Sequence, residues 1–191
     1  MMIAFVLLAQ FTNAQETRNL GDFDAVKVFD KINVKLISAS ENKIVITGSR
    51  AEEVETINKN GELKIRMPFP KLLSGDAITV KLYFKRIESI DAGEGSYVSA
   101  DKTFKQTSMN LNAKEGAKIN VDVDVDKVKV RAVSGGIIEI AGKALNQDVV
   151  ITSGGILKAD DLHTSQTSIS VSAGGKAEIH ATTLVDAKVK A

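Results

Sequence analysis

The residues of this sequence that could take part in chemistry are few, and its two histidines come first. His163 and His180 are the only histidines, and the chain has no cysteine. Nucleophilic catalysis needs a serine or thiol held by a base and an acid that orients the base, and the sequence has no nucleophile-elbow motif. The lack of cysteine excludes thiol catalysis and thiolate metal sites. We therefore interpret both histidines as surface residues and assign no catalytic residue.

Three aspartates occupy every second position in the segment VDVDVD, residues 121–126. This alternation places Asp122, Asp124 and Asp126 on one face of a strand and the valines on the other. Carboxylates attract Ca²⁺, but neighbours on one strand face are about 7 Å apart, too far for three of them to bind one ion. Polar residues ordinarily alternate outward on a half-buried strand, so we interpret these aspartates as a solvated face. No metal or other cofactor is predicted.

The segment RMPFPKLLSGD, residues 66–76, is the most unusual loop and contains both prolines of the chain. Because prolines interrupt strand pairing, the apolar residues Phe69, Leu72 and Leu73 need another environment. They could form an exposed anchor for a partner, as apolar hot spots do at interfaces. They could instead cover an open end of a repeat core, which terminal repeats require. Both interpretations stay open, and Phe69, Leu72 and Leu73 are the candidate partner-contact residues.

Length and composition indicate one globular domain. Of 191 residues, 43% are hydrophobic and 26% are charged, which suffices for a substantial core. The formal net charge is only +1, so no excess of basic residues exists to neutralise phosphates, and nucleic acid is not a predicted partner. Acidic and basic side chains are interspersed along the chain, which is typical of solvated faces.

The N-terminus has the pattern of an export signal. Residues 1–14, MMIAFVLLAQFTNA, contain an apolar run that is too short to span a bilayer, which takes about 20 residues. Such a run followed by small residues is typical of a secretory signal peptide, and we expect cleavage between Ala14 and Gln15. We predict export, a linker over residues 15–21 and a mature chain without a transmembrane span.

Most of the remaining chain alternates with the period of a strand that has one buried face. The segments that show this alternation most clearly are DAVKVFDKINVKLIS, KIVITG, GELKIRM and AITVKLYF. Asn60-Gly61 separates two alternating segments and predicts a tight hairpin. Residues 49–60 are the one stretch in which a turn or two of helix is as plausible as a strand.

From about residue 90 the alternation becomes a repeat. Aligned segments place one glycine each in a common column, 19 to 21 residues apart: Gly95, Gly116, Gly136, Gly155 and Gly175. This period is too short for a helical hairpin or a propeller blade, but it fits one rung of a β-solenoid. We interpret the glycines as stacked corners, where the chain must bend sharply or approach another rung closely.

The same alignment predicts how the solenoid is filled. Valine, isoleucine and leucine beside the corners would fill its interior, and four small residues would stack in one column: Ala92, Ala113, Ala132 and Ala173. His163 and His180 fall about one rung apart and so come near each other on adjacent rungs. The predicted fold is all-β, a right-handed parallel β-helix or solenoid with short strands and an N-terminal strand and hairpin region. The alternative is an antiparallel sandwich of short strands.

The order of these motifs resembles the bacterial putative auto-transporter adhesin head domain, also called the GIN domain. The likeness rests on GDFDAVKVFDKINVKLISASENKIVITG, on NGELKIRM, on AITVKLYFKRIESIDAGEGSYV and on the Ser-Gly-Gly rungs. It implies a single β-helical domain over residues 22–191 with repeats from about residue 90. It also implies export to the periplasm, the outer-membrane surface or the extracellular space, often in bacteria of the Bacteroidetes type. The family has no agreed catalytic residues that could be carried over to this chain.

Two functions follow from these observations. The first is a non-enzymatic, adhesin-like binding or scaffold module, since the long faces of a solenoid suit a polysaccharide or a cell-surface protein. The second is a carbohydrate-active enzyme like the pectin-degrading β-helices, whose clefts carry clustered acidic and basic residues. Asp160 and Asp161 are the nearest such cluster, but a turn explains them better. We expect the binding module and no enzyme activity.

Overall fold

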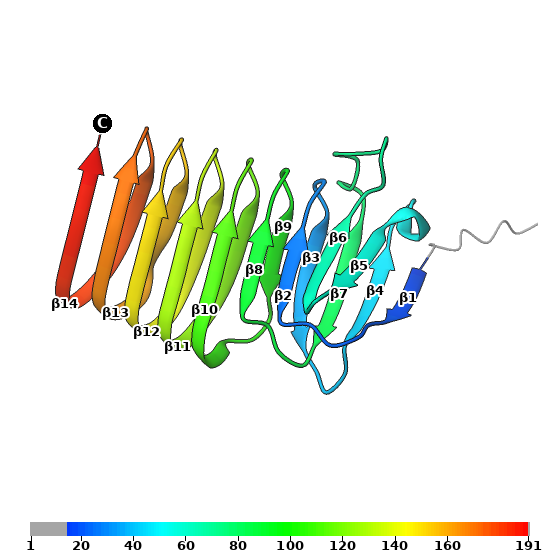
Figure 1. The fold of residues 1–191 in the computed structure, drawn as a ribbon, viewed down its shortest axis with the longest axis horizontal. Coiled ribbons are helices and arrows are strands. Elements are labelled where there is room, and N and C mark those ends of the chain that lie inside the picture. The colour runs from blue at the N-terminus through cyan, green and yellow to red at the C-terminus, as the bar shows by residue number, and fades with distance from the viewer. Residues whose placement is uncertain (1–14, 191) are drawn as a thin grey trace, which may run out of the picture.

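The computed structural model of the chain, described over residues 15–190, is a flattened solenoid built almost entirely of strands (Figure 1). The predicted signal peptide, residues 1–14, lies outside the described residues. Short elements come first: β1 (Gln15–Asn19), β2 (Ala25–Val28), β3 (Asn33–Ser38), β4 (Lys43–Thr47), the 3-10 helix η1 (Ala51–Glu53), β5 (Glu55–Lys59), β6 (Glu62–Arg66), β7 (Thr79–Phe84), β8 (Ser89–Ala92) and β9 (Tyr97–Ala100). Longer strands follow: β10 (Phe104–Ala113), β11 (Lys118–Ala132), β12 (Ile137–Ile151), β13 (Ile156–Ser172) and β14 (Lys176–Lys190). The predicted all-β solenoid is confirmed.

The strands form two faces that share the longer strands. One face runs β1-β4-β7-β3-β9 and the other runs β5-β6-β2-β8-β10, and both continue into β11. Residues 118–120 of β11 pair with β9, and residues 123–132 pair with β10. β11 therefore bends from one face to the other, and β12, β13 and β14 follow it in parallel. Short strands were predicted, but β11 to β14 have 15 to 17 residues because they cross between the faces without a break.

Tight two-residue turns stack along one long edge of the solenoid, which we call the turn edge. Five of them have a non-glycine residue and then a glycine at positive φ: Glu94-Gly95, Glu115-Gly116, Ser134-Gly135, Ser153-Gly154 and Ala173-Gly174. Two successive positive φ angles are typical of a type I′ turn. The glycine amides of the first four turns each donate to the following turn, as in the bond from Gly116 N to Ser134 O at 3.1 Å. The turn edge is therefore a hydrogen-bonded ladder.

The predicted glycine column is wrong by one residue in its last three members. In each Gly-Gly pair the first glycine, not the second, occupies the turn position of Gly95 and Gly116. The second glycines follow the turn: Gly136, Gly155 and Gly175. A Cβ on Gly136 would lie 2.1 Å from the carbonyl oxygen of Ala113 in the preceding rung. The first glycine is thus needed for its dihedral angle, and the second is needed because two rungs touch there.

The predicted filling of the solenoid is confirmed except at one position. Ala92, Ala113 and Ala132 stack in register, and all three are buried. Ala173 does not join them, because it is the first central residue of a turn with φ 49°. The buried apolar side chains form one continuous core between the two faces, from Phe23 to Ile169.

The N-terminal region departs from the regular coil. β4 pairs antiparallel with β1 and β7, and β5 pairs antiparallel with β6 around Asn60-Gly61, which confirms the predicted hairpin. Residues 49–60 contain both expected structures, since η1 precedes β5. The linker predicted over residues 15–21 is wrong for Gln15–Asn19, which form β1. This strand is held by its backbone pairing with β4, and its polar side chains gave no apolar alternation.

Candidate functional site: a polar cleft where two rungs separate

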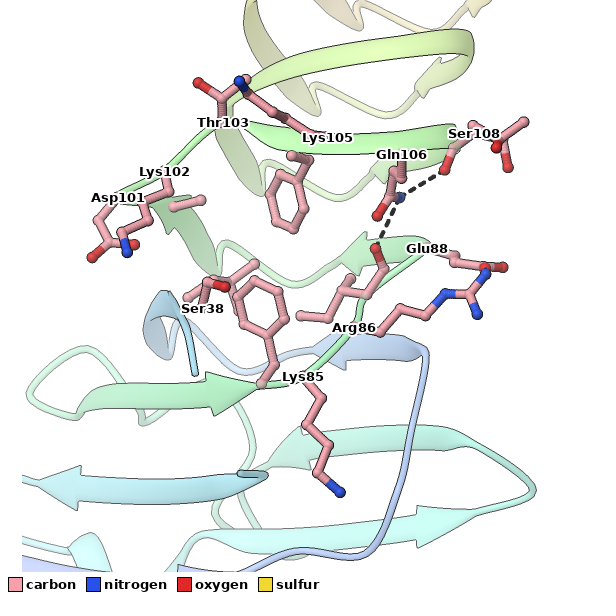
Figure 2. A pocket seen from close by; sticks show the side chains of 16 residues that line it. Ser38, Lys85, Arg86, Glu88, Asp101, Lys102, Thr103, Lys105, Gln106 and Ser108 are labelled. Carbon is pink, nitrogen blue, oxygen red and sulfur yellow. Dashed lines mark hydrogen bonds and ion pairs between the residues drawn. The ribbon is translucent and has the colours of Figure 1, made fainter. Parts of the chain in front are cut away.

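A cleft of about 550 Å³ opens on the long edge opposite the turns, where the chain crosses between the two faces (Figure 2). We call it the edge cleft. Two successive crossings border it, residues 85–88 between β7 and β8 and residues 101–103 between β9 and β10. In the next rungs β11, β12 and β13 cross this edge as unbroken strands. The edge cleft therefore marks the place where the N-terminal region meets the regular coil.

The edge cleft exists because β10 lacks a neighbouring strand along its first half. β8 pairs only with residues 110–113 of β10, whereas β11 pairs with β10 from Phe104 onward. The backbone from Phe104 to Met109 thus has a strand on one side only. Its other side faces the crossing at residues 85–88, and backbone groups there are available to side chains or to a ligand.

One side chain bridges part of this gap. Gln106 Nε2 donates to the carbonyl oxygens of Ile87 at 3.0 Å and of Ser108 at 2.7 Å, as the dashed lines in Figure 2 show. Hydroxyl groups complete the polar lining: Ser38, Thr103, Thr107 and Ser108. Because hydroxyls and amides both donate and accept hydrogen bonds, this lining suits a ligand that is rich in hydroxyl groups.

Two phenylalanines form the apolar floor of the edge cleft. The rings of Phe84 and Phe104 stack with their centroids 5.6 Å apart, and the two residues are only 7% and 5% exposed. This packing holds β7 and the start of β10 at a fixed separation. A ligand would therefore contact mainly the polar and charged rim above the rings.

The rim carries more positive than negative charge. Its charged residues are Lys85, Arg86, Lys102 and Lys105 against Glu88 and Asp101. Lys85 Nζ lies 2.9 Å from an oxygen of Asp22, and Arg86 is paired with Glu88. Lys102 and Lys105 are exposed and form no ion pair within residues 15–190. Two ammonium groups at this rim are thus available to an anionic ligand.

The predicted partner-contact loop lies on the turn edge, away from the edge cleft. Phe69 is 84% exposed, and Leu72 and Leu73 are about half exposed. Phe69 therefore does not cap the core, because it is almost wholly in solvent. Leu72 and Leu73 line a shallow hollow beside Lys31, Glu94, Gly95 and Glu115. The loop presents apolar side chains next to the first turns of the solenoid, and its contact with a partner stays a prediction.

A buried aspartate that the sequence reasoning missed holds this loop in place. Asp30 is 1% exposed, and its carboxylate accepts hydrogen bonds from the amides of Met67 at 2.9 Å and Leu73 at 2.8 Å. Burial, Asp30 and the neighbouring Glu115 raise the pKa of Glu94 above its ordinary value. Three carboxyl groups, those of Asp30, Glu94 and Glu115, thus lie close together at this part of the turn edge. The rim of the edge cleft, in contrast, carries more basic than acidic side chains.

The other candidate residues of the sequence are not gathered into one site. Asp122, Asp124 and Asp126 point outward from β11, as predicted for a solvated face. Asp160 and Asp161 are exposed in an irregular part of β13. Within residues 15–190 no group of three or more histidine, aspartate or glutamate side chains is arranged to hold a metal ion.

His163 and His180 are adjacent, as the repeat predicted. They are in register on β13 and β14, and their ring centroids lie 4.5 Å apart.

Comparison with known proteins gives a family and a fold. The family model described as putative auto-transporter adhesin, head GIN domain, matches residues 22–191. None of the curated proteins compared with the chain matches it. The part of the chain that the structure describes contains no helix with the length and apolar character of a membrane span.

Three solved structures have a similar fold, and each is of a putative adhesin. The protein from Bacteroides fragilis has a TM-score of 0.87 at 13% identity, over 95% of this chain and 86% of that chain. The protein from Parabacteroides distasonis has a TM-score of 0.72 at 20% identity, over 94% and 87%. The protein from Parabacteroides merdae has a TM-score of 0.70 at 18% identity, over 94% and 93%. At these identities the likeness shows the fold alone.

Proposed function

The chain belongs to the family of putative auto-transporter adhesin head GIN domains. From this premise we propose that it is an exported, adhesin-like module, and that it binds an acidic polysaccharide in the edge cleft. The compartment is the periplasm, the outer-membrane surface or the extracellular space. Binding is its whole activity in this proposal, with no bond made or broken in the ligand.

The observation that carries the proposal is the pair of cations at the rim. Lys102 and Lys105 project from the loop and first residues of β10 without an ion-pair partner in residues 15–190. A carboxylate or sulfate group on a sugar would form charge-assisted hydrogen bonds with them. The hydroxyl and amide groups of the lining would then bind the sugar hydroxyls.

The carboxylates of the edge cleft support binding rather than hydrolysis. Hydrolysis of a glycosidic bond ordinarily takes two carboxyl groups, one as acid and the other as base or nucleophile. Glu88 is paired with Arg86, so Asp101 is the one carboxylate of the lining without a cationic partner within the described residues. Asp160 and Asp161 are exposed on β13 and do not line the edge cleft.

A matched pair of ligands tests the proposal. We would titrate the protein with an oligogalacturonate and with its methyl ester, in which a neutral ester group replaces each carboxylate. We expect the acid to bind and the ester to bind at least about tenfold more weakly, with affinity that falls as salt is raised. A parallel assay for new reducing ends should detect no product.

Variants locate the site. The double change Lys102→Ala and Lys105→Ala should weaken binding of the acid by about tenfold or more, since a hydrogen bond to a charged group contributes about 1.5–3 kcal/mol. Lys129→Ala is the matched control, because Lys129 is also an exposed lysine without an ion pair in residues 15–190 but lies outside the edge cleft. Equal binding of acid and ester, or an unchanged affinity in the double variant, would contradict the proposal. Release of reducing ends would favour the enzyme instead.

A cell-surface protein is the second candidate ligand. It is supported by the exposed apolar loop, where Phe69 is 84% exposed beside half-exposed Leu72 and Leu73. An exposed aromatic side chain such as Phe69 can fill a pocket on a partner, as aromatic anchors do at protein interfaces. This site is separate from the edge cleft, so the two candidates predict effects in different variants.

A further inference from the structure

The two histidines of the chain lie side by side on the last two strands of the solenoid. His163 on β13 is in register with His180 on β14. Their ring centroids are 4.5 Å apart and the ring planes make an angle of 69°. Both residues are exposed, and neither imidazole forms a hydrogen bond or an ion pair within residues 15–190. Each ring therefore has ring nitrogens that are open to a ligand from solvent.

Hydrogen bonds just after the histidines fix the two strands relative to each other. Thr164 Oγ1 donates to the backbone carbonyl of His180 at 2.9 Å. Thr182 Oγ1 donates to the carbonyl of Thr164 at 3.0 Å. Hydrogen bonds thus join the two strands within two residues of the histidines. The backbone that carries the imidazoles therefore loses little conformational freedom when one ligand binds both rings.

The separation of the rings matches that of two imidazoles bound to one metal ion. A metal–nitrogen bond is about 2.0 Å, and the centre of an imidazole ring lies roughly 1.2 Å behind its nitrogen. Two such ligands at a right angle place their ring centres about 4.5 Å apart, as in the square arrangement that Cu²⁺ prefers. The observed distance is 4.5 Å, so the two rings are as close to each other as two imidazoles that share one ion in this arrangement.

We propose that His163 and His180 form a two-imidazole site for a divalent transition metal, with Cu²⁺ bound more tightly than Ni²⁺ or Zn²⁺. Imidazole suits all three ions, and affinities for a given set of nitrogen ligands rise to a maximum at Cu²⁺. Because no third histidine, aspartate or glutamate joins the pair within residues 15–190, water or a donor atom from another molecule fills the remaining coordination positions. This site is independent of the edge cleft.

The test uses the whole chain without a histidine tag. Cu²⁺ is titrated by calorimetry, and electron paramagnetic resonance of the bound ion counts the nitrogen ligands. We expect one Cu²⁺ per chain with two equatorial nitrogens. Loss of one ligand should lower the affinity by more than about 100-fold, since even changes next to a metal ligand cost about 10–100-fold. His163→Ala and His180→Ala are therefore each expected to lose tight binding.

Lys143→Ala is the matched control, because Lys143 on the neighbouring strand β12 is in register with His163 and is not a proposed ligand. Because this change removes a positive charge beside the site, the variant should bind Cu²⁺ at least as tightly as the unaltered chain and keep the two-nitrogen signal. Circular dichroism checks that each variant is folded, and both histidines are exposed, so their loss opens no cavity. No tight Cu²⁺ binding by the unaltered chain, or tight binding that survives either histidine change, would overturn the proposal.

Discussion

The two glycines of each Ser-Gly-Gly turn should differ sharply in what an alanine costs, because they are needed for different reasons. Gly135 has φ +74°, and a Cβ there would have no neighbour closer than 3.9 Å. Gly136 has no positive φ, but its Cβ would lie 2.1 Å from Ala113 O and 2.4 Å from the carbonyl carbon. The first change therefore strains only the dihedral angle, and the second pushes two rungs apart.

The structure sets the expected magnitudes. An ordinary residue in the left-handed region costs roughly 1–2 kcal/mol, which is the expected loss for Gly135→Ala. In Gly136→Ala the rungs must separate by about 1 Å, which breaks the bond from Val133 N to Ala113 O, now 3.0 Å long. An unsatisfied buried group costs about 1–3 kcal/mol, and loosened packing adds to it, so we expect a loss of about 3–5 kcal/mol. That is a large part of the 5–15 kcal/mol typical of a domain.

Urea unfolding followed by far-ultraviolet circular dichroism measures both losses, with midpoints compared at a common slope. Gly116→Ala is the matched control, because Gly116 has φ +72° and no atom within 4 Å of a Cβ. It should resemble Gly135→Ala. A Gly136→Ala variant within about 1 kcal/mol of Gly135→Ala would refute the assignment of separate roles to the paired glycines.

Three further changes test the charged and apolar surfaces. Burial, Asp30 and Glu115 raise the pKa of Glu94, so ionisation of this carboxyl group lowers the free energy of unfolding as pH rises through that pKa. Glu94→Gln should therefore add up to about 1 kcal/mol to the free energy of unfolding at pH 7. The gain should vanish near pH 4, where the glutamate is protonated as well. Two lysines lower the pKa of Glu139, so Glu139→Gln should lose roughly 1 kcal/mol at pH 7, and this loss should fade as pH drops below about 4. Urea unfolding at each pH checks both signs. Phe69→Ser should leave stability within about 0.5 kcal/mol, since the side chain is 84% exposed, and should abolish capture of a cell-surface protein if the loop binds one.

The repeat made the solenoid predictable from the sequence, but not the register of its turns. Strand alternation and the period near 20 residues result from burial, and buried positions can be recognised in the sequence by their apolar residues. A Gly-Gly pair can be aligned on either glycine, and rungs of 19 to 21 residues allow both. The choice depends on which amide meets the next turn, as Gly116 N meets Ser134 O. That contact is between backbone atoms, so the side-chain types do not show which glycine makes it.

The edge cleft could not be predicted because it results from a missing strand neighbour. Polar residues follow Phe104 until the alternation resumes at Met109, but no residue type shows that the neighbouring strand β8 begins only at Ser89, opposite Asn110, and leaves this half of β10 unpaired. β1 was missed for a related reason, since its pairing with β4 does not depend on its side chains. Asp30 was missed as well, because a single aspartate after a strand is ordinarily a turn residue and here accepts two loop amides.

Hydrogen–deuterium exchange with and without a saturating acidic oligosaccharide tests the binding proposal most directly. The amides of residues 104–109 have a strand on one side only, so part of them should exchange fast in the free protein. We predict that the ligand slows exchange in residues 85–88 and 101–109 and leaves the turn edge unchanged. Protection confined to residues 66–76, or none anywhere, would contradict the assignment of the edge cleft as the binding site.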